Sequence, residues 1–373
     1  MSKTPYILAI DQGTSSTRAA LIDEKGIIID QESTEFKQIY PSSGWVEHDP
    51  LEILQTVKST ISIIFARNNI IQNDIVSCGI TNQRETIVAW DKVTGKPLYN
   101  AIVWQDRRTN EICKNLVDKN YTNFIQEKTG LIIDPYFSAS KIQWLLENIK
   151  DQQNLIVGTI DTWIIWNLTN KTKHVTDITN ASRTMLYNIT DEIWDDDLLK
   201  LFNIRKSILP TVLSNKDEYG TIHSKHFGIE IPIGGVVGDQ QSASLGQLCL
   251  KKGMIKATFG TGCFVLINTD KNKITSKAKL LTTVASKIDE KKQFAVEGSI
   301  FNAGTVIQWL RDEMKLFNHV NEIDVIIQDS KDEVTFIPAF TGLGAPYWKP
   351  GVRGALYGIT RDTSKGDIIK AAL

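Results

Sequence analysis

The chain has 373 residues, with 42 basic and 43 acidic side chains and a formal net charge of −1. This balance argues against nucleic acid or an anionic membrane as the main partner. The content of 42% hydrophobic and 23% charged residues excludes intrinsic disorder, and no apolar run reaches the roughly 18 residues of a membrane-spanning helix. The four cysteines form no CxxC pair and no export signal precedes Asp11, which predicts reduced thiols and a cytoplasmic location.

The N-terminal segment predicts a β-hairpin with a polar tip. Tyr6–Ile10 and Ala19–Ile22 are short apolar runs, and Asp11–Thr17 between them is rich in turn residues. Apolar residues then recur at helical spacing over Leu51–Asn68, and Ile75–Ile80 has the pattern of a strand. Strands that alternate with helices predict an α/β layered architecture.

Asp239 follows the strand-like run Ile231–Val237 and precedes the start of a polar helix. Two interpretations are open. Asp239 could be an N-cap, which is a common role of aspartate. It could instead be a carboxylate at a strand end that faces a cleft and accepts a proton from a substrate hydroxyl during phosphoryl transfer.

A second hairpin of the first type is predicted later in the chain. Met254–Phe259 and Cys263–Asn268 are strand-like and enclose the turn Gly260–Gly262. The recurrence of strand, Gly/Thr turn and strand predicts two related halves, with a boundary near Gly246. Backbone N–H groups and hydroxyls at such tips can bind an anion, although a plain tight hairpin uses the same residue types.

Arg84, Glu85 and Trp104 are further candidates with two interpretations each. Adjacent residues in a regular strand point to opposite faces, so Arg84 and Glu85 can meet one ligand only if the strand has ended. The alternative is a surface charge pair. Trp104 stands before a cluster of charged residues and could be a half-buried aromatic residue or part of a site.

The last residues predict the first turns of a helix. Ser364–Asp367 has the pattern of a capping box, and an apolar stripe begins at Ile368. The chain ends at Leu373, soon after this start and without a stop signal, which predicts a shortened version of a longer ancestral chain.

Eleven segments, in order along the whole chain, carry a resemblance to a known family: Asp11–Arg18, Asn82–Thr86, Ala101–Thr109, Asp134–Lys141, Gly158–Trp163, Asn180–Met185, Gly238–Gln241, Phe259–Phe264, Ala303–Asp312, Gly344–Trp348 and Gly354–Gly358. In these segments the chain resembles the glycerol kinases of the FGGY family of carbohydrate kinases. The resemblance implies the two-domain actin/hexokinase-like ATPase fold, with duplicated ribonuclease-H-like halves and an inter-domain cleft. It also implies ATP-dependent phosphorylation of glycerol to sn-glycerol 3-phosphate.

The resemblance implies a glycerol site and an ATP site. Asp239 would be the general base. The residues implied for glycerol are Arg84, Glu85, Trp104, Tyr136, Asp239, Gln240 and Phe264. Asp11 resembles the carboxylate near Mg²⁺, a hard cation that prefers oxygen ligands. The residues implied for ATP are Gln12, Gly13, Thr14, Ser15, Ser16, Arg18, Thr261, Gly304 and Gln308.

The chain departs from the family pattern at its end, because family members continue past the point that corresponds to Leu373. We therefore expect an N-terminal domain over residues 1–246 and an incomplete C-terminal domain over residues 247–373. The alternatives to an active glycerol kinase are a non-catalytic remnant, half of a split enzyme that still binds glycerol, and a related polyol or sugar kinase. The expected partners are glycerol and ATP, with a second copy or a complementing C-terminal fragment as candidates to cover apolar surface.

Overall fold

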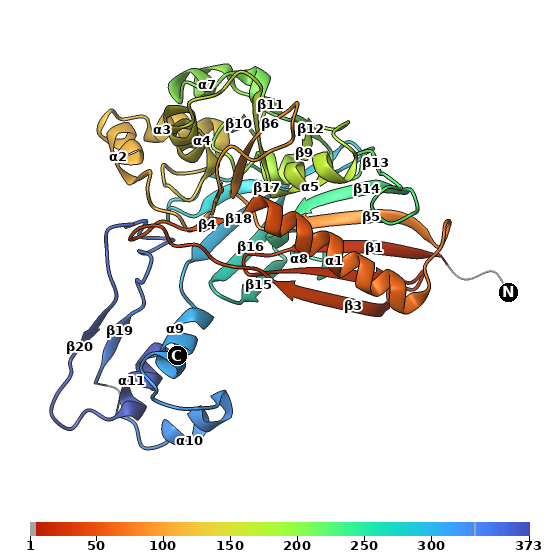
Figure 1. Cartoon of the computed structure of the whole chain (residues 1–373). Coiled ribbons are helices and arrows are strands. Elements are labelled where there is room, and N and C mark those ends of the chain that lie inside the picture. The colour runs from red at the N-terminus through yellow and green to blue at the C-terminus, as the bar shows by residue number, and fades with distance from the viewer. Residues whose placement is uncertain (1–4, 332) are drawn as a thin grey trace.

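The computed structural model describes residues 5–331 and 333–373, in which helices pack on several β-sheets (Figure 1). The first sheet has six strands in the order β13-β14-β5-β1-β2-β3. The strands β1, β2 and β3 are antiparallel, whereas β5 runs parallel to both β1 and β14. The strands of this sheet are β1 (Tyr6–Gln12), β2 (Ser16–Ile22), β3 (Ile28–Glu35), β5 (Ile75–Asn82), β13 (Thr221–Ile222) and β14 (Ile231–Gly238).

The predicted N-terminal hairpin and the helix after it are confirmed. A bond of 2.9 Å from Gly13 N to Ser16 O closes the tip of the hairpin. The helix α1 (Pro50–Asn68) begins after Asp49, whose side chain accepts from Leu51 N, and it packs on β2 and β3. Together with α5 (Ile160–Leu168), it buries an apolar core against this sheet.

A second layer lies beside this sheet, above it in Figure 1. Its four-stranded sheet has the order β4-β7-β6-β8 and packs against helices that build the largest apolar core. Two short strand pairs, β10-β11 and β9-β12, complete this region. Its elements are β4 (Glu47–His48), β6 (Ile87–Asp91), β7 (Ala101–Ile102), α2 (Asn110–Asp118), α3 (Thr122–Thr129), α4 (Ser138–Asn148), β8 (Leu155–Thr159), β9 (Val175–Asp177), α6 (Ile178–Ala181), β10 (Tyr187–Asn188), β11 (Ile193–Trp194), α7 (Asp196–Leu201) and β12 (Thr211–Leu213).

The second predicted hairpin is also confirmed, and it belongs to an antiparallel sheet of order β15-β16-β18-β17. Phe264, Leu281, Val284 and Phe294 of this sheet share one hydrophobic core with the second layer. The two parts of the chain are therefore packed together rather than merely linked. The elements are α8 (Asp239–Gly246), β15 (Ile255–Phe259), β16 (Cys263–Asp270), β17 (Leu281–Ile288) and β18 (Lys291–Ile300).

The C-terminal elements form a lobe at the lower left of Figure 1, with a small core of its own around Val306, Leu310 and Ile369. The predicted capping box is present, because Ser364 and Asp367 exchange side-chain to backbone bonds at the start of α11. The elements are α9 (Gly304–Asp312), α10 (Ile323–Ile326), β19 (Thr335–Ile337), β20 (Ala355–Tyr357) and α11 (Lys365–Ala372).

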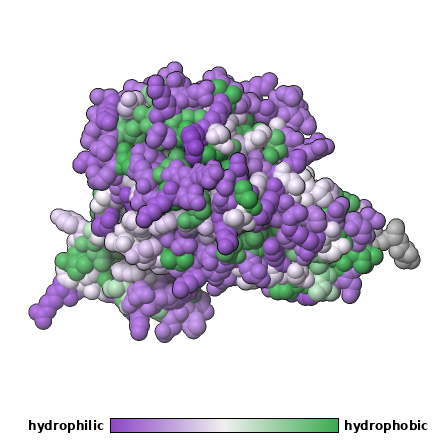
Figure 2. Space-filling view, turned by 45° about the horizontal axis from the view of Figure 1, so that its top comes forward, coloured by the Kyte–Doolittle hydropathy of each residue, from purple (hydrophilic) through white to green (hydrophobic). Residues whose placement is uncertain are grey.

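The face shown in Figure 2 is mainly hydrophilic, with hydrophobic residues in separate patches. All four cysteines are free and buried. Within residues 5–331 and 333–373, no helix is both long enough and apolar enough to cross a membrane.

Candidate functional site

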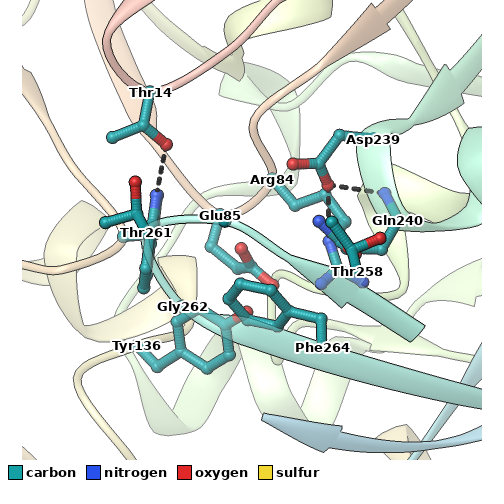
Figure 3. Close-up of a pocket in the computed structure, with 12 residues that line it drawn as sticks. Thr14, Arg84, Glu85, Tyr136, Asp239, Gln240, Thr258, Thr261, Gly262 and Phe264 are labelled. Atoms are coloured by element: carbon teal, nitrogen blue, oxygen red, sulfur yellow. Dashed lines mark hydrogen bonds and ion pairs between the residues drawn. The ribbon is translucent and has the colours of Figure 1, made fainter. Parts of the chain in front are cut away.

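A pocket of about 130 Å³ opens where the tips of the two Gly/Thr hairpins face each other. It lies beside the carboxyl ends of the parallel strands β5 and β14, the edge where open α/β sheets bind ligands. Figure 3 shows Thr14 and Thr261 on one side, Asp239 and Gln240 on another, and Tyr136 and Phe264 below. The pocket is lined by Thr14, Arg84, Glu85, Trp104, Tyr136, Asp239, Gln240, Thr258, Gly260, Thr261, Gly262 and Phe264. All seven residues that the resemblance assigns to glycerol are in this set.

Arg84 and Glu85 reach this pocket because the strand has ended before them. β5 stops at Asn82, and Glu85 has a left-handed backbone with φ of 61°. Such a conformation is unfavourable for a residue with a side chain and marks a turn of the chain after the strand. Arg84 and Glu85 are only 3% and 1% exposed, so the alternative of a surface charge pair is wrong.

The Arg84 guanidinium is held by carboxylates and an amide. Two parallel bonds of 2.7 and 3.1 Å join it to Glu297 on β18, and Nη1 also donates to Gln241 Oε1 at 3.1 Å. Gly238 leaves room for this side chain, because a Cβ there would lie 2.9 Å from Cγ and Cδ of Arg84. Within the described chain, Nη2 keeps one N–H without a partner.

Glu85 is the acceptor next to this arginine. Its Oε1 accepts from Arg183 Nε at 2.6 Å, and Arg183 Nη2 donates to Glu297 Oε1 at 2.9 Å. No residue in the described ranges bonds to Glu85 Oε2, so this oxygen is available to a ligand. Burial raises the pKa of Glu85, and the two arginines oppose that rise. Arg183 and Glu297 together thus fix the orientation of the residues that line the pocket.

Asp239 presents one held oxygen and one free oxygen. Gly238 is the N-cap of α8, so the alternative role of Asp239 as N-cap is wrong. Oδ1 accepts from Gln240 N at 2.7 Å and pairs with Arg84 Nε at 3.2 Å. Nothing in the described chain bonds to Oδ2. Desolvation in the cleft raises the pKa of Asp239, and Arg84 opposes the rise. A carboxylate with a raised pKa and a free oxygen is suited to accept a proton.

Aromatic side chains form the apolar wall of the pocket. The Trp104 ring lies edge-on to Tyr136 and Phe264, with centroids 5.6 and 5.9 Å away. Trp104 Nε1 donates to Thr14 Oγ1 at 2.9 Å, which joins this wall to the tip of the first hairpin. The buried Nζ of Lys141 donates to the carbonyls of residues 135, 136 and 137 and thereby supports the loop that carries Tyr136.

The residues predicted for ATP on the first hairpin differ in their surroundings. Thr14 lines the pocket. The Gln12 side chain is buried and bonds to Gly13 O and to the amide of Gln83. Ser15 and Arg18 are exposed at the tip and on β2, while Gly13 and Ser16 close the turn.

Around the second hairpin, three more predicted residues come together. Gly260 O accepts from Gly304 N at 2.8 Å, and Thr261 O accepts from Ala303 N at 2.9 Å. A Cβ on Gly304 would stand 2.6 Å from Gly260 O, so a glycine is required for this approach. The start of α9 therefore lies against the hairpin tip, and the exposed Gln308 follows one turn later on the same helix face.

Asp11 lies at the end of β1 opposite Arg18. Desolvation is the main cause of the raised pKa of Asp239, and the negative charge of Asp11 adds to it, although Asp11 is not among the residues that line the pocket. The described residues contain no cluster of three or more His, Cys, Asp or Glu side chains that could hold a metal ion. Mg²⁺ in phosphoryl-transfer sites commonly takes one or two protein carboxylates and the oxygens of a nucleotide, and Asp11 fits this role.

No sequence motif indicates a role for Glu297, Arg183, Lys256 or Thr258. Glu297 is fully buried within β18, and its neighbours Val296 and Gly298 give the segment the pattern of an ordinary strand. A charged residue inside an apolar strand was the one available signal. Arg183 lies in a segment that carries the family resemblance, but nothing in its local pattern points to Glu85.

Comparisons with known proteins show which family the chain resembles along its length. Residues 6–246 match the N-terminal domain, and residues 255–373 the C-terminal domain, of the FGGY family of carbohydrate kinases. A glycerol kinase of Petrotoga mobilis is 51% identical over 376 residues, which cover 99% of this chain and 76% of that protein. Glycerol kinase 1 of Clostridium tetani is 50% identical over 377 residues, with the same coverage of both chains.

The crystal structure of Plasmodium falciparum glycerol kinase with ADP is similar to this structure with a TM-score of 0.87. The two chains are 40% identical, and the match covers 99% of this chain and 76% of the other. Together with the two matched domains, this similarity confirms the predicted α/β class and the actin/hexokinase-like ATPase fold.

Proposed function

Since this chain belongs to the FGGY family of carbohydrate kinases, we propose that it transfers the γ-phosphoryl group of ATP to glycerol and forms sn-glycerol 3-phosphate. The observation that carries this proposal is the pocket itself. In about 130 Å³ it combines an aromatic wall with an arginine N–H, a glutamate oxygen and an aspartate oxygen that have no partner among residues 5–331 and 333–373.

A triol suits this set of groups. Arg84 Nη2 donates to one hydroxyl oxygen, Glu85 Oε2 accepts from a hydroxyl, and the faces of Trp104 and Phe264 contact the C–H groups. Because these polar groups are buried, an analogue that lacks a hydroxyl leaves one of them without a partner. The site therefore discriminates against smaller and less hydroxylated alcohols.

Asp239 Oδ2 takes the proton from the hydroxyl that attacks the γ-phosphorus atom. The new bond joins that oxygen to phosphorus, the bond from phosphorus to the β–γ bridging oxygen breaks, and ADP leaves. Arg84 holds the carboxylate by its other oxygen, Oδ1, so that Oδ2 keeps its direction. Positioning of this kind supplies much of the catalysis in phosphoryl transfer.

The nucleotide lies, in this proposal, between the two hairpin tips. The backbone N–H groups and hydroxyls of Gly13–Ser16 and of Gly260–Gly262 face its phosphates, and the start of α9 favours negative charge. Gln12, Arg18, Gly304 and Gln308 surround the same space. Asp11 holds Mg²⁺, which neutralises charge on the phosphate oxygens when it is bound.

The domain division stays a prediction, with glycerol-binding residues mainly in 1–246 and the second phosphate hairpin in 247–373. A second copy of the chain or a complementing C-terminal fragment as partner is also still a prediction. Gel filtration with light scattering tests for a second copy of the chain, and co-purification with a separately expressed fragment tests for the complementing C-terminal partner.

The experiment that tests the proposed function follows ADP release by the purified chain with Mg-ATP, with and without glycerol. We expect release that depends on glycerol and that Asp239→Asn reduces by about 10²- to 10⁴-fold, the usual contribution of a general base. Calorimetric titration with glycerol shows whether the variant still binds. Equal turnover by Asp239→Asn, or faster phosphorylation of a pentulose than of glycerol, contradicts the proposal.

A further inference from the structure

Lys256 is a buried cation directly behind the pocket. It lies on β15 two residues before Thr258, so the two side chains point to the same face of the strand and toward the pocket. Only 4% of Lys256 is exposed. Its Nζ donates to Gln240 Oε1 at 2.5 Å, and in the described residues this is its one hydrogen bond.

This contact decides how the Gln240 amide is oriented. The two ends of a glutamine amide are alike in shape, so only its partners determine which end is oxygen and which is nitrogen. A lysine ammonium has three donors and no acceptor. The amide atom that faces Lys256 must therefore be the oxygen, and the nitrogen is the end left for another partner.

The nitrogen end is available to a ligand. Gln240 lines the pocket, and no hydrogen bond of its Nε2 occurs in the described part of the chain. The free end of this side chain can thus only donate. A substrate group that meets it must be an oxygen with a lone pair, as a hydroxyl provides.

We propose that Lys256 is a positioning residue that fixes the Gln240 amide with its nitrogen toward the pocket, so that this position of the site recognises a hydroxyl oxygen as acceptor. The inference rests on the proposed function, because it names the substrate atom that one side of the proposed glycerol site recognises. Lys256 itself does not touch the substrate and acts through Gln240.

The charges around Lys256 are consistent with this role. Desolvation, and then the positive charge of Arg84, lower the pKa of Lys256 to about 8, while Asp239, Glu297 and Cys263 oppose the lowering. At neutral pH the side chain is therefore mainly an ammonium and remains a pure donor. Methionine has a similar length and no donor, so Lys256→Met removes the orienting bond and leaves the space filled.

A double-mutant cycle tests whether Lys256 acts through Gln240. The dissociation constant for glycerol is measured by calorimetry at neutral pH in the parent, Lys256→Met, Gln240→Ala and the double variant. We expect Lys256→Met to weaken glycerol binding about tenfold in the parent and to change nothing in the Gln240→Ala background. Lys252→Met, which removes an exposed charge just before the same strand, is the matched control and leaves binding unchanged.

Equal weakening in both backgrounds overturns the proposal, because Lys256 would then act by another route. Unchanged binding in Lys256→Met overturns it as well. If Lys256→Met does not fold, Lys256→Arg takes its place, because arginine is also a donor without an acceptor and should retain the parent affinity. Loss of binding in a folded Lys256→Arg variant that keeps its ATP affinity is then the contradicting result.

A ligand-free readout separates this inference from the proposed function. The side-chain amide signals of Gln240, identified by their absence in Gln240→Ala, report its environment by NMR in a deuterated sample. We expect Lys256→Met to shift them, and no shift contradicts the proposal. A parent chain that does not bind glycerol overturns the proposed function, while these signals still test the orientation.

Discussion

Arg84 and Glu297 form a two-bond ion pair at the floor of the pocket, although they are 213 residues apart in the sequence. The guanidinium and the carboxylate are both buried, and Arg183 shares the same carboxylate. Desolvation alone would raise the pKa of Glu297. The positive charges of Arg183 and Arg84 outweigh this effect and lower the pKa to about 2. Arg84 follows the end of β5 and lines the pocket, and it is thus held by a strand of another sheet.

We expect Glu297→Gln to lower the free energy of unfolding by about 3 to 5 kcal/mol, because Arg84 and Arg183 are both buried and each loses one of its two carboxylate partners. The glycerol KM should rise at the same time, since Arg84 and Glu85 lose their alignment. Urea unfolding and steady-state kinetics measure the two effects. Ser299→Ala is the matched control, because it removes only the bond from Ser299 Oγ to Glu297 Oε1 and should cost about 1 kcal/mol. Equal losses in the two variants contradict a role for the arginine contacts.

The pH dependence of turnover should show the raised pKa of Asp239. A general base works only when deprotonated, so kcat/KM falls as the pH falls through its pKa in the free enzyme. Desolvation raises that pKa and Arg84 opposes the rise, which places the acid limb above the ordinary aspartate value of about 3.9. A pH–rate profile measures it. An acid limb at or below the ordinary value, or an unchanged profile in Asp239→Asn, would refute the assignment.

Lys141→Met should disturb Tyr136 without touching the substrate. The buried Lys141 Nζ donates to three successive carbonyls, and the substitution takes this donor away from all three. We expect a loss of about 3 kcal/mol in unfolding free energy and a higher KM for glycerol, with the KM for ATP unchanged. Lys114→Met on the exposed side of α2 is the control. If ATP and glycerol KM rise together, the loop around Tyr136 is not the cause.

Gly304→Ala should weaken the binding of ATP and leave the binding of glycerol intact. The added Cβ would stand 2.6 Å from Gly260 O, so the start of α9 must move away from the hairpin tip. We expect the KM for ATP to rise about tenfold or more, measured with saturating glycerol. Gly246→Ala, at the end of α8 with open space around its Cβ, serves as the matched glycine control. An unchanged KM for ATP in Gly304→Ala would show that this approach is not needed.

The sequence predicts the residues that line the pocket better than the residues that hold them in place. Arg84, Glu85 and Asp239 lie in short segments with distinctive local patterns, and all three line the pocket. Their two interpretations could be separated only by the structure, because the deciding facts are the positive φ of Glu85 and the N-cap at Gly238. Neither fact has a signature in the neighbouring residues.

Glu297 and Lys256 could not be predicted as supports, because their partners come from distant elements. Val296 and Gly298 flank Glu297 as they would in any buried strand, and Lys256 lies within the first strand of the predicted hairpin without a motif of its own. The hairpins, α1 and the capping box of α11 were predictable because they depend on local periodicity and turn residues. The shared core of the second layer and the β15–β18 sheet depends on long-range packing, which periodicity does not encode.

The hydrogen bond from Trp104 Nε1 to Thr14 Oγ1 makes this tryptophan an optical reporter of occupancy. Its ring forms part of the apolar wall of the pocket, while its indole N–H is bonded to the tip of the first hairpin, where we propose that the nucleotide binds. Indole emission responds both to ring contacts and to the partner of the N–H group. Filling either side of the site should therefore change the light that Trp104 emits, and the difference between the parent and Trp104→Phe separates its signal from those of the other tryptophans.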